Sequence, residues 1–93
     1  MIKTFADKRT AELSRGNHVK QFAPFAEQAR RRLTRLDEAQ TIHDLMVYPS
    51  NRFEALRGDR KGQYSIRIND QWRICFRFEN GDAYDVEIAD YHR

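Results

Sequence analysis

Cysteine is nearly absent from this sequence of 93 residues, in which Cys75 is the only thiol. A single thiol excludes an internal disulfide, and no paired Cys/His spacing or HExxH motif is present, so we expect neither a metal nor another cofactor. No apolar run approaches the roughly 20 residues of a spanning helix, and the opening MIKTFADKR lacks the apolar centre of a signal peptide. These absences predict a protein of the reducing cytoplasm with no membrane partner.

The sequence also lacks internal repeats and low-complexity linkers. Its 93 residues are too few to divide between two cores, so we expect residues 1–93 to form one domain. Hydrophobic residues make up 40% and aromatic residues 12% of the chain. This is enough to bury a core and disfavours wholesale disorder.

Charge is divided unevenly along the chain, although the net charge is only +3. The stretch from Arg52 to Arg77 holds seven basic and three acidic residues, whereas the stretch from Phe78 to Arg93 holds one basic and five acidic residues. This order is typical of an anion-binding surface beside a region that balances it or supplies catalytic carboxylates. A solvated, salt-bridged surface would produce the same pattern.

Helices are predicted in the first half of the chain, after a short strand at residues 2–5. Asp7 is a suitable N-cap for a helix through Leu13, which ends at Gly16 because glycine tolerates the left-handed conformation. Pro24 is expected at the first position of a second helix. The core face of this helix carries apolar residues at three- and four-residue spacing: Phe22, Phe25, Ala29, Leu33 and Leu36.

The opposite face of the second helix is basic, with Arg30, Arg31 and Arg35. We interpret it as an ordinary solvated face in preference to a dedicated RNA contact. Thr41 and Asp44 have the spacing of a capping box. They predict a short third helix that ends before Pro49.

Alternating apolar residues predict three antiparallel strands, over residues 64–68, 72–78 and 84–88. Opposed residues share a face of the sheet, so matching the apolar sets pairs Ile66 with Ile74. Residues 69–71 then form the loop between the first two strands.

The same register sets charged residues against each other on the second face. Arg67 faces Arg73, and two opposed guanidinium groups repel each other unless an anion or a carboxylate lies between them. Neither has a partner within the predicted strands, which suggests a phosphate site. Arg77 is expected opposite Asp85, its structural partner. Cys75 lies between apolar neighbours and is interpreted as packing, not as a nucleophile.

These elements predict a small α+β domain, with helices on the apolar face of a twisted sheet and a basic concave face opposite. The last strand leads into Asp90, Tyr91 and His92. An imidazole can give up a proton near neutral pH, an arginine can neutralise a phosphorane, and a tyrosine ring can stack on a base. This end of the sheet is therefore the candidate site, although an inert tail would carry the same residues.

A family resemblance is carried by the run from Asn51, NRFEALRGDRKGQYSIRINDQWRICF, and by the closing DYH. With the opening MIKTF and the two-helix layout, the chain resembles the HigB toxins of the RelE/ParE superfamily over essentially its whole length. The resemblance implies a RelE-like microbial ribonuclease fold, with an antiparallel sheet that is mixed at its edge and two to three N-terminal helices on one face.

The resemblance also implies an activity and partners. Such a toxin of a type II toxin–antitoxin system is expected to cleave messenger RNA in the decoding site of the ribosome and to inhibit translation. A cognate HigA antitoxin with a helix-turn-helix domain is expected to neutralise it. Contact with operator DNA is expected only through that antitoxin.

Residue roles follow from the resemblance position by position. Asp90, Tyr91 and His92 match the terminal catalytic cluster, and Arg73 matches the arginine that holds the scissile phosphate. Further contacts with RNA phosphates are expected from four basic residues: Arg57, Arg60, Lys61 and Arg67.

Glu54 departs from the family pattern, because some active relatives carry a histidine there as a proposed base. A carboxylate can deprotonate a ribose 2′-hydroxyl, but the ordinary pKa of about 4.3 for such a group makes it a weaker base unless burial raises that pKa. Glu54 is equally interpretable as a surface partner of Arg52 or Arg57.

The implied reaction is a metal-independent transesterification. The 2′-oxygen attacks the neighbouring phosphorus and produces a 2′,3′-cyclic phosphate and a free 5′-hydroxyl, with His92 protonating the leaving oxygen. Two alternatives stay open. One is a ParE-like inhibitor of DNA gyrase, against which the closing DYH argues, and the other is a binding module that has lost catalysis through Glu54.

Overall fold

The computed structural model describes residues 1–91. α1 (Lys8–Ser14) begins where the N-cap predicted, because the Oδ1 of Asp7 accepts a hydrogen bond from the Thr10 amide at 2.7 Å. The chain leaves this helix through Gly16, which has a φ of 90°. Within residues 1–91, no helix has the length and apolarity needed to cross a membrane.

α2 (Ala26–Glu38) begins two residues later than predicted, because Pro24 lies in a preceding 3-10 helix, η1 (Lys20–Phe25). Proline has no amide hydrogen to donate and fits the tightly wound turn that often precedes an α-helix. η1 carries Phe22 and Phe25 against Trp72, with ring-centroid distances of 5.7 and 5.1 Å. The predicted apolar stripe is buried, but its first two residues belong to η1.

α3 (Ile42–Met46) begins with the predicted capping box, in which Thr41 and Asp44 exchange both hydrogen bonds. It is followed by a 3-10 helix, η2 (Pro49–Asn51), and then by Arg52, whose φ of 41° is left-handed. Residues other than glycine and asparagine rarely adopt this conformation, so contacts elsewhere in the fold must hold it.

The basic side chains of α2 were predicted to be simply solvated, which is wrong for two of the three. Arg30 donates hydrogen bonds to the carbonyl oxygens of Leu13, in α1, and of Asn17, in the segment after it. Arg35 donates to the Oδ1 of Asn51 at 2.9 Å and so ties α2 to η2. Arg31 pairs with Glu27 on the exposed surface of its own helix.

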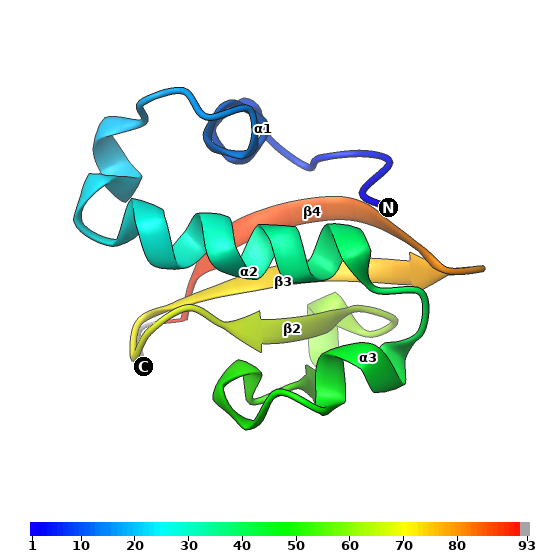
Figure 1. Ribbon diagram of the computed structural model, residues 1–93. Helices are drawn as coiled ribbons and strands as arrows, with labels where there is room; N and C mark the ends of the chain where they lie inside the picture. The colour runs from blue at the N-terminus through cyan, green and yellow to red at the C-terminus, as the bar shows by residue number, and fades with distance from the viewer. Residues whose placement is uncertain (92–93) are drawn as a thin grey trace.

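The sheet has the order β1-β2-β3-β4, with every neighbouring pair antiparallel. Its strands are β1 (Glu54–Ala55), β2 (Tyr64–Arg67), β3 (Trp72–Glu79) and β4 (Asp82–Asp90), with a 3-10 helix, η3 (Gly58–Arg60), between the first two. Two parallel bridges, Ile2 to Ala83 and Phe5 to Val86, join the N-terminal segment to β4 and give the expected mixed edge. Figure 1 shows α2 lying over one face of the sheet.

The register between β2 and β3 is the predicted one. Ile66 lies opposite Ile74, and Arg67 lies opposite Arg73. Residues 69–71 form the connecting turn. Matching the apolar residues across the hairpin predicted this register correctly, because the two strands pair without a bulge.

The register between β3 and β4 is shifted by a bulge, so the prediction that Arg77 lies directly opposite Asp85 is wrong, although Asp85 is its partner, as predicted. Arg77 lies opposite Tyr84. Asp85 has a φ of 54°, and its amide donates to the Oγ1 of Thr4 at 2.8 Å, so a contact with the N-terminal segment accompanies the bulge. The Nε of Arg77 nevertheless donates to the Oδ2 of Asp85 at 2.9 Å.

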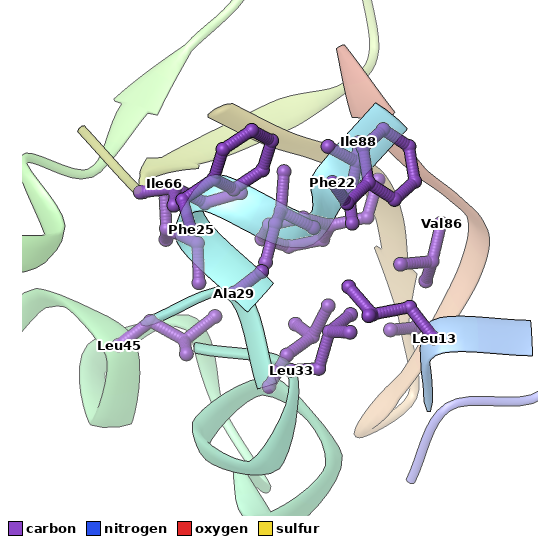
Figure 2. Close-up of a cluster of buried hydrophobic side chains, with 14 of the residues drawn as sticks. Leu13, Phe22, Phe25, Ala29, Leu33, Leu45, Ile66, Val86 and Ile88 are labelled. Atoms are coloured by element: carbon purple, nitrogen blue, oxygen red, sulfur yellow. The ribbon is translucent and has the colours of Figure 1, made fainter. Parts of the chain in front are cut away.

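The main core lies between the helices and one face of the sheet. Figure 2 shows side chains from both layers gathered in one cluster, including Leu13, Leu33, Ile66 and Val86, each 3% exposed or less. Truncating a leucine buried to this degree typically costs about 2–5 kcal/mol of folding free energy. The core therefore fixes the sheet and leaves its other face for chemistry.

Candidate active site

The face of the sheet opposite the main core, called here the outer face, carries alternate residues of all four strands. Two cross-strand rows run over it: Glu54–Ser65–Cys75–Glu87 and Arg67–Arg73–Ala89. The predicted basic face is therefore mixed in charge. The acidic residues are Glu87 on β4 and Glu54 on β1, a strand that the sequence did not predict.

Arg73 lies at the centre of the outer face, with its side chain 13% exposed. Its Nε donates to the Oγ of Ser65 at 2.7 Å, and its Nη2 donates to the carbonyl oxygen of Arg52. The Oε1 of Glu54 lies 3.9 Å from Nε, close enough to balance charge but too far for a hydrogen bond. Burial lowers the pKa of Arg73 and Glu54 opposes this shift, yet a guanidinium stays charged at any ordinary pH.

The two opposed arginines were predicted to lack partners within the strands. This is wrong for Arg73, because Ser65 on β2 binds it. Arg67 forms an ion pair with Asp70, which lies in the turn after β2 and not in a strand. The like-charge pair remains, since Arg67 contributes to lowering the pKa of Arg73.

Tyr91 packs on a small apolar cluster of the outer face, formed by Leu56, Cys75 and Ala89. Its amide donates to the carbonyl oxygen of Gln71 at 2.6 Å, which continues the pairing beyond the end of β4. Burial raises the pKa of the Tyr91 phenol, so the group stays protonated at neutral pH and can donate a hydrogen bond. Small side chains at positions 75 and 89 leave room for the ring.

The other basic residues expected at the site differ in whether their side chains are already bound to other residues. Arg60 is partly buried and donates to the Oε1 of Glu87 at 3.2 Å and to the Oε1 of Gln63 at 3.0 Å. Arg57 and Lys61 are exposed and form no ion pair with residues 1–91. Arg57 and Lys61 can therefore reach a phosphate without breaking a contact, whereas Arg60 cannot.

Of the terminal cluster, the structure describes Asp90 and Tyr91. Asp90 is exposed at the end of β4, opposite Trp72, and its Oδ2 accepts a hydrogen bond from the Nε2 of Gln71 at 3.1 Å. His92 lies outside the described residues. The expected position of its imidazole beside Arg73 stays a prediction.

Potential metal ligands do not gather into a cluster within residues 1–91, and the thiol of Cys75 is buried. Within residues 1–91, no group of three or more His, Cys, Asp or Glu side chains could hold a metal ion. Cys75 is fully buried, as predicted, and burial raises the pKa of its thiol. A buried, protonated thiol is a poor nucleophile.

A family model described as the RelE-like toxin HigB of type II toxin–antitoxin systems matches residues 3–92. The chain belongs to this HigB-like family. The predicted family is thereby confirmed.

Two relatives of this HigB-like chain have informative names. Endoribonuclease HigB of Proteus vulgaris is 43% identical over 63 residues, and Toxin HigB-1 of Vibrio cholerae is 45% identical over 58 residues. These alignments cover 66% and 62% of this chain, and 65% and 61% of the relatives. The matched region thus spans less than two thirds of the length of either relative.

The HigB-like fold also has solved counterparts. A YafQ mutant from E. coli has a TM-score of 0.63 at 12% identity, covering 97% of this chain and 91% of that one. A chain of the YoeB–YefM complex from Staphylococcus aureus has a TM-score of 0.61 at 16% identity, covering 100% and 99%. At such low identity the likeness concerns the fold alone, and it confirms the predicted RelE-like architecture.

Three contacts of Arg73 in this HigB-like chain were not anticipated from the sequence. The charge partner of Glu54 was expected to be Arg52 or Arg57, and in the structure it is Arg73. Ser65 was counted only as a polar residue of an alternating strand, although its place diagonal to Arg73 in the predicted register was a usable signal. The contact with the Arg52 carbonyl could not be predicted from the sequence, because the left-handed turn that directs this carbonyl depends on tertiary contacts.

Proposed function

We propose that this HigB-like protein is the toxin of a type II toxin–antitoxin system and acts as an endoribonuclease on messenger RNA. The observation that carries the proposal is the Arg73 guanidinium, held on the outer face beside the Glu54 carboxylate and near the Tyr91 ring. In RNA, the guanidinium can bind a phosphate, the carboxylate can accept the proton of a ribose hydroxyl, and the ring can stack on a base. The name of the Proteus relative, Endoribonuclease HigB, supports the same activity.

The reaction is a transesterification that needs no metal. Glu54 takes the proton of the 2′-hydroxyl, the 2′-oxygen forms a bond to phosphorus, and the bond from phosphorus to the 5′-oxygen breaks. His92 gives a proton to that oxygen, which leaves as a hydroxyl. Arg73, helped by Arg67 and Arg57, stabilises the charge on the non-bridging oxygens, an effect worth several kcal/mol in a preorganised site.

The remaining groups of the site orient the reactants. The ring of Tyr91 rests on the small apolar cluster of the outer face and can stack on a nucleotide that leaves its neighbours. Asp90 would set the position of His92 or of the terminal backbone. Arg60 helps to hold the outer face through Glu87, and Lys61 contacts an RNA phosphate from the exposed surface.

The ribosome is the proposed site of action. A half-exposed site with few catalytic groups cannot by itself set the 2′-oxygen in line with the leaving group. Messenger RNA held in the decoding site would arrive with that geometry fixed. We expect cleavage of translated message to be much faster than cleavage of the same RNA in free solution.

The proposed antitoxin is a HigA-type protein with a helix-turn-helix domain. The family is defined by type II systems, in which toxin and antitoxin form a pair. Operator DNA would be contacted through the antitoxin, and the complex would act in the cytoplasm.

The function is tested by mapping the 5′ ends of cellular transcripts after brief expression of the wild-type protein. In-frame cuts within translated codons, carrying free 5′-hydroxyls, are the expected result. DNA breaks without such cuts would favour a ParE-like gyrase inhibitor instead. Inhibited growth with neither lesion would favour a module that only binds.

A further inference from the structure

The guanidinium of Arg73 is held along one edge by two separate parts of the fold. Ser65, which is fully buried on β2, accepts a hydrogen bond from Nε at 2.7 Å. The Arg52 carbonyl oxygen, at the end of η2, accepts a hydrogen bond from Nη2. Among residues 1–91, the remaining nitrogen, Nη1, has no hydrogen-bond acceptor.

The direction of the Arg52 carbonyl depends on an unusual backbone. Arg52 has φ 41° and ψ 54°, a left-handed conformation that carries a steric cost for any residue with a Cβ atom. Non-glycine residues remain in it only where surrounding contacts impose it, and such positions gather at functional sites. The amide of Arg52 donates to the carbonyl oxygen of Pro49 at 3.1 Å, and the buried residue before it supplies further contacts.

Asn51 stabilises this turn through hydrogen bonds of its buried side chain and of its amide. Its side chain is fully buried, its Nδ2 donates to the carbonyl oxygen of Leu45 at 3.0 Å, and its Oδ1 accepts from the Nη1 of Arg35 at 2.9 Å. The Asn51 amide also donates to the Tyr48 carbonyl oxygen at 2.9 Å. A chain of contacts therefore runs from α2 and α3 through Asn51 to the Arg52 carbonyl, and from there to Arg73.

We propose that Ser65 and Asn51 are positioning residues for Arg73. Ser65 acts directly on Nε, and Asn51 acts through the Arg52 carbonyl on Nη2. Together they fix the plane of the guanidinium so that Nη1 is presented to the phosphodiester. This inference rests on the proposed function, in which Arg73 holds the scissile phosphate.

Preorganisation of this kind affects the chemical step more than binding. An arginine side chain has many rotamers, and a cation whose direction is already set loses little freedom when charge develops on the phosphate. Removing a positioning contact should therefore lower kcat and leave KM nearly unchanged, because the net charge at the site is the same.

The first test is a double-mutant cycle, measured on translating ribosomes as single-turnover cleavage with the protein in excess. Ser65→Ala should lower the cleavage rate by about tenfold or more in the wild-type background. In the Arg73→Ala background the same substitution should change the residual rate by less than about twofold, because the residue it serves is gone. A merely structural role would give equal losses in both backgrounds.

Thr10→Ala is the matched control for loss of a buried hydroxyl. Thr10 is also fully buried, and its Oγ1 accepts a hydrogen bond from the Ile88 amide at 3.0 Å on the side of the sheet away from Arg73. It should reduce thermal stability comparably to Ser65→Ala while leaving the cleavage rate within about twofold of wild type. A loss of cleavage equal to that of Ser65→Ala would assign the effect to stability and overturn the proposal.

The second test exploits the left-handed turn. Asn51→Ala should lower kcat, and adding Arg52→Gly should restore part of it, because glycine adopts positive φ without steric cost and keeps the carbonyl. Adding Arg52→Ala should restore nothing. Equal effects of glycine and alanine would contradict the proposed route through the Arg52 carbonyl.

A measurement without substrate keeps the two proposals separate. In the NMR spectrum of the free protein, the Nε–H of Arg73 should exchange slowly with solvent in the wild type and at least about tenfold faster in Ser65→Ala. If the wild type cleaves no RNA, the proposed function fails whatever the exchange rate in Ser65→Ala. If the wild type and Arg73→Ala cleave RNA equally, the phosphate-holding role of Arg73 fails, and the positioning proposal fails with it. If Arg73→Ala is inactive but Ser65→Ala has wild-type exchange and cleavage, the positioning proposal alone fails.

Discussion

The Nε of Arg73 on β3 lies 3.9 Å from the Oε1 of Glu54 on β1, so the guanidinium reaches across the intervening strand β2. The Glu54 side chain is 46% exposed, and solvent screens the contact. A phosphate entering the site can therefore displace the carboxylate from Arg73. The released carboxylate would remain close to the ribose and could act as the base.

Glu54→Gln tests that role. The amide keeps the size of the side chain but cannot accept a proton, so kcat should fall by about a hundredfold or more. Glu54→His should retain cleavage, because an imidazole can also take the proton of the 2′-hydroxyl. Wild-type rates for Glu54→Gln would reduce Glu54 to a charge partner of Arg73.

Arg67→Gln should make the protein more stable and less active. Arg67 lies directly opposite Arg73, and removing one of two like charges on neighbouring strands should raise the free energy of unfolding by up to about 1 kcal/mol. The same change should raise KM for RNA, because a phosphate contact is lost. Urea unfolding and cleavage assays measure the two effects, and a less stable Arg67→Gln protein would show that its ion pair with Asp70 outweighs the repulsion.

Local signals explain why much of the fold was predictable. The Asp7 cap, the Thr41–Asp44 box and the alternation in β2 and β3 each depend on residues close together in the sequence. Glu54–Ala55 is too short to show an alternation, and the bulge at Asp85 depends on Thr4 far away in the chain. These features required the tertiary structure.

For the candidate site, the position of Arg73 was predictable, but most of the groups that contact it were not. Arg73 followed from the strand register and from the family resemblance, and the same register placed Arg67 opposite it. Two partners of Arg73 could not be predicted, because Glu54 comes from an unpredicted strand and the Arg52 carbonyl from an unpredicted turn. Both depend on how the segment after α3 folds back on the sheet.

Tyr91→Phe and Tyr91→Ala separate stacking from hydrogen bonding. The phenylalanine ring should still pack on Leu56, Cys75 and Ala89 and keep most of the activity. Alanine removes the stacking surface, worth about 1–3 kcal/mol per base, so kcat/KM should fall by roughly five- to 150-fold. If Tyr91→Phe lost as much as Tyr91→Ala, the hydroxyl and not the ring would be the group that matters.

The capping box of α3 predicts a pH dependence of stability. Hydrogen bonds from the Gln40 and Thr41 amides lower the pKa of Asp44 below its unfolded value. The carboxylate therefore stabilises the fold above the unfolded pKa, and this contribution is lost as the pH falls through the folded pKa.

Asp44→Asn should accordingly have a lower melting temperature than wild type at neutral pH, with the difference shrinking toward strongly acidic pH. Asp59→Asn removes another exposed carboxylate and serves as the control. A difference between wild type and Asp44→Asn that stayed constant over the whole pH range would refute the linkage.

The central claim is that Arg73 stabilises the scissile phosphate, and cleavage of message on translating ribosomes tests it most directly. Arg77→Ala is the matched control, because Arg77 lies on the same strand but is bound to Asp85 and Glu79. We predict that Arg73→Ala lowers kcat by about a hundredfold or more, while Arg77→Ala stays close to wild type. Equal cleavage by wild type and Arg73→Ala, with both proteins folded, would contradict the account.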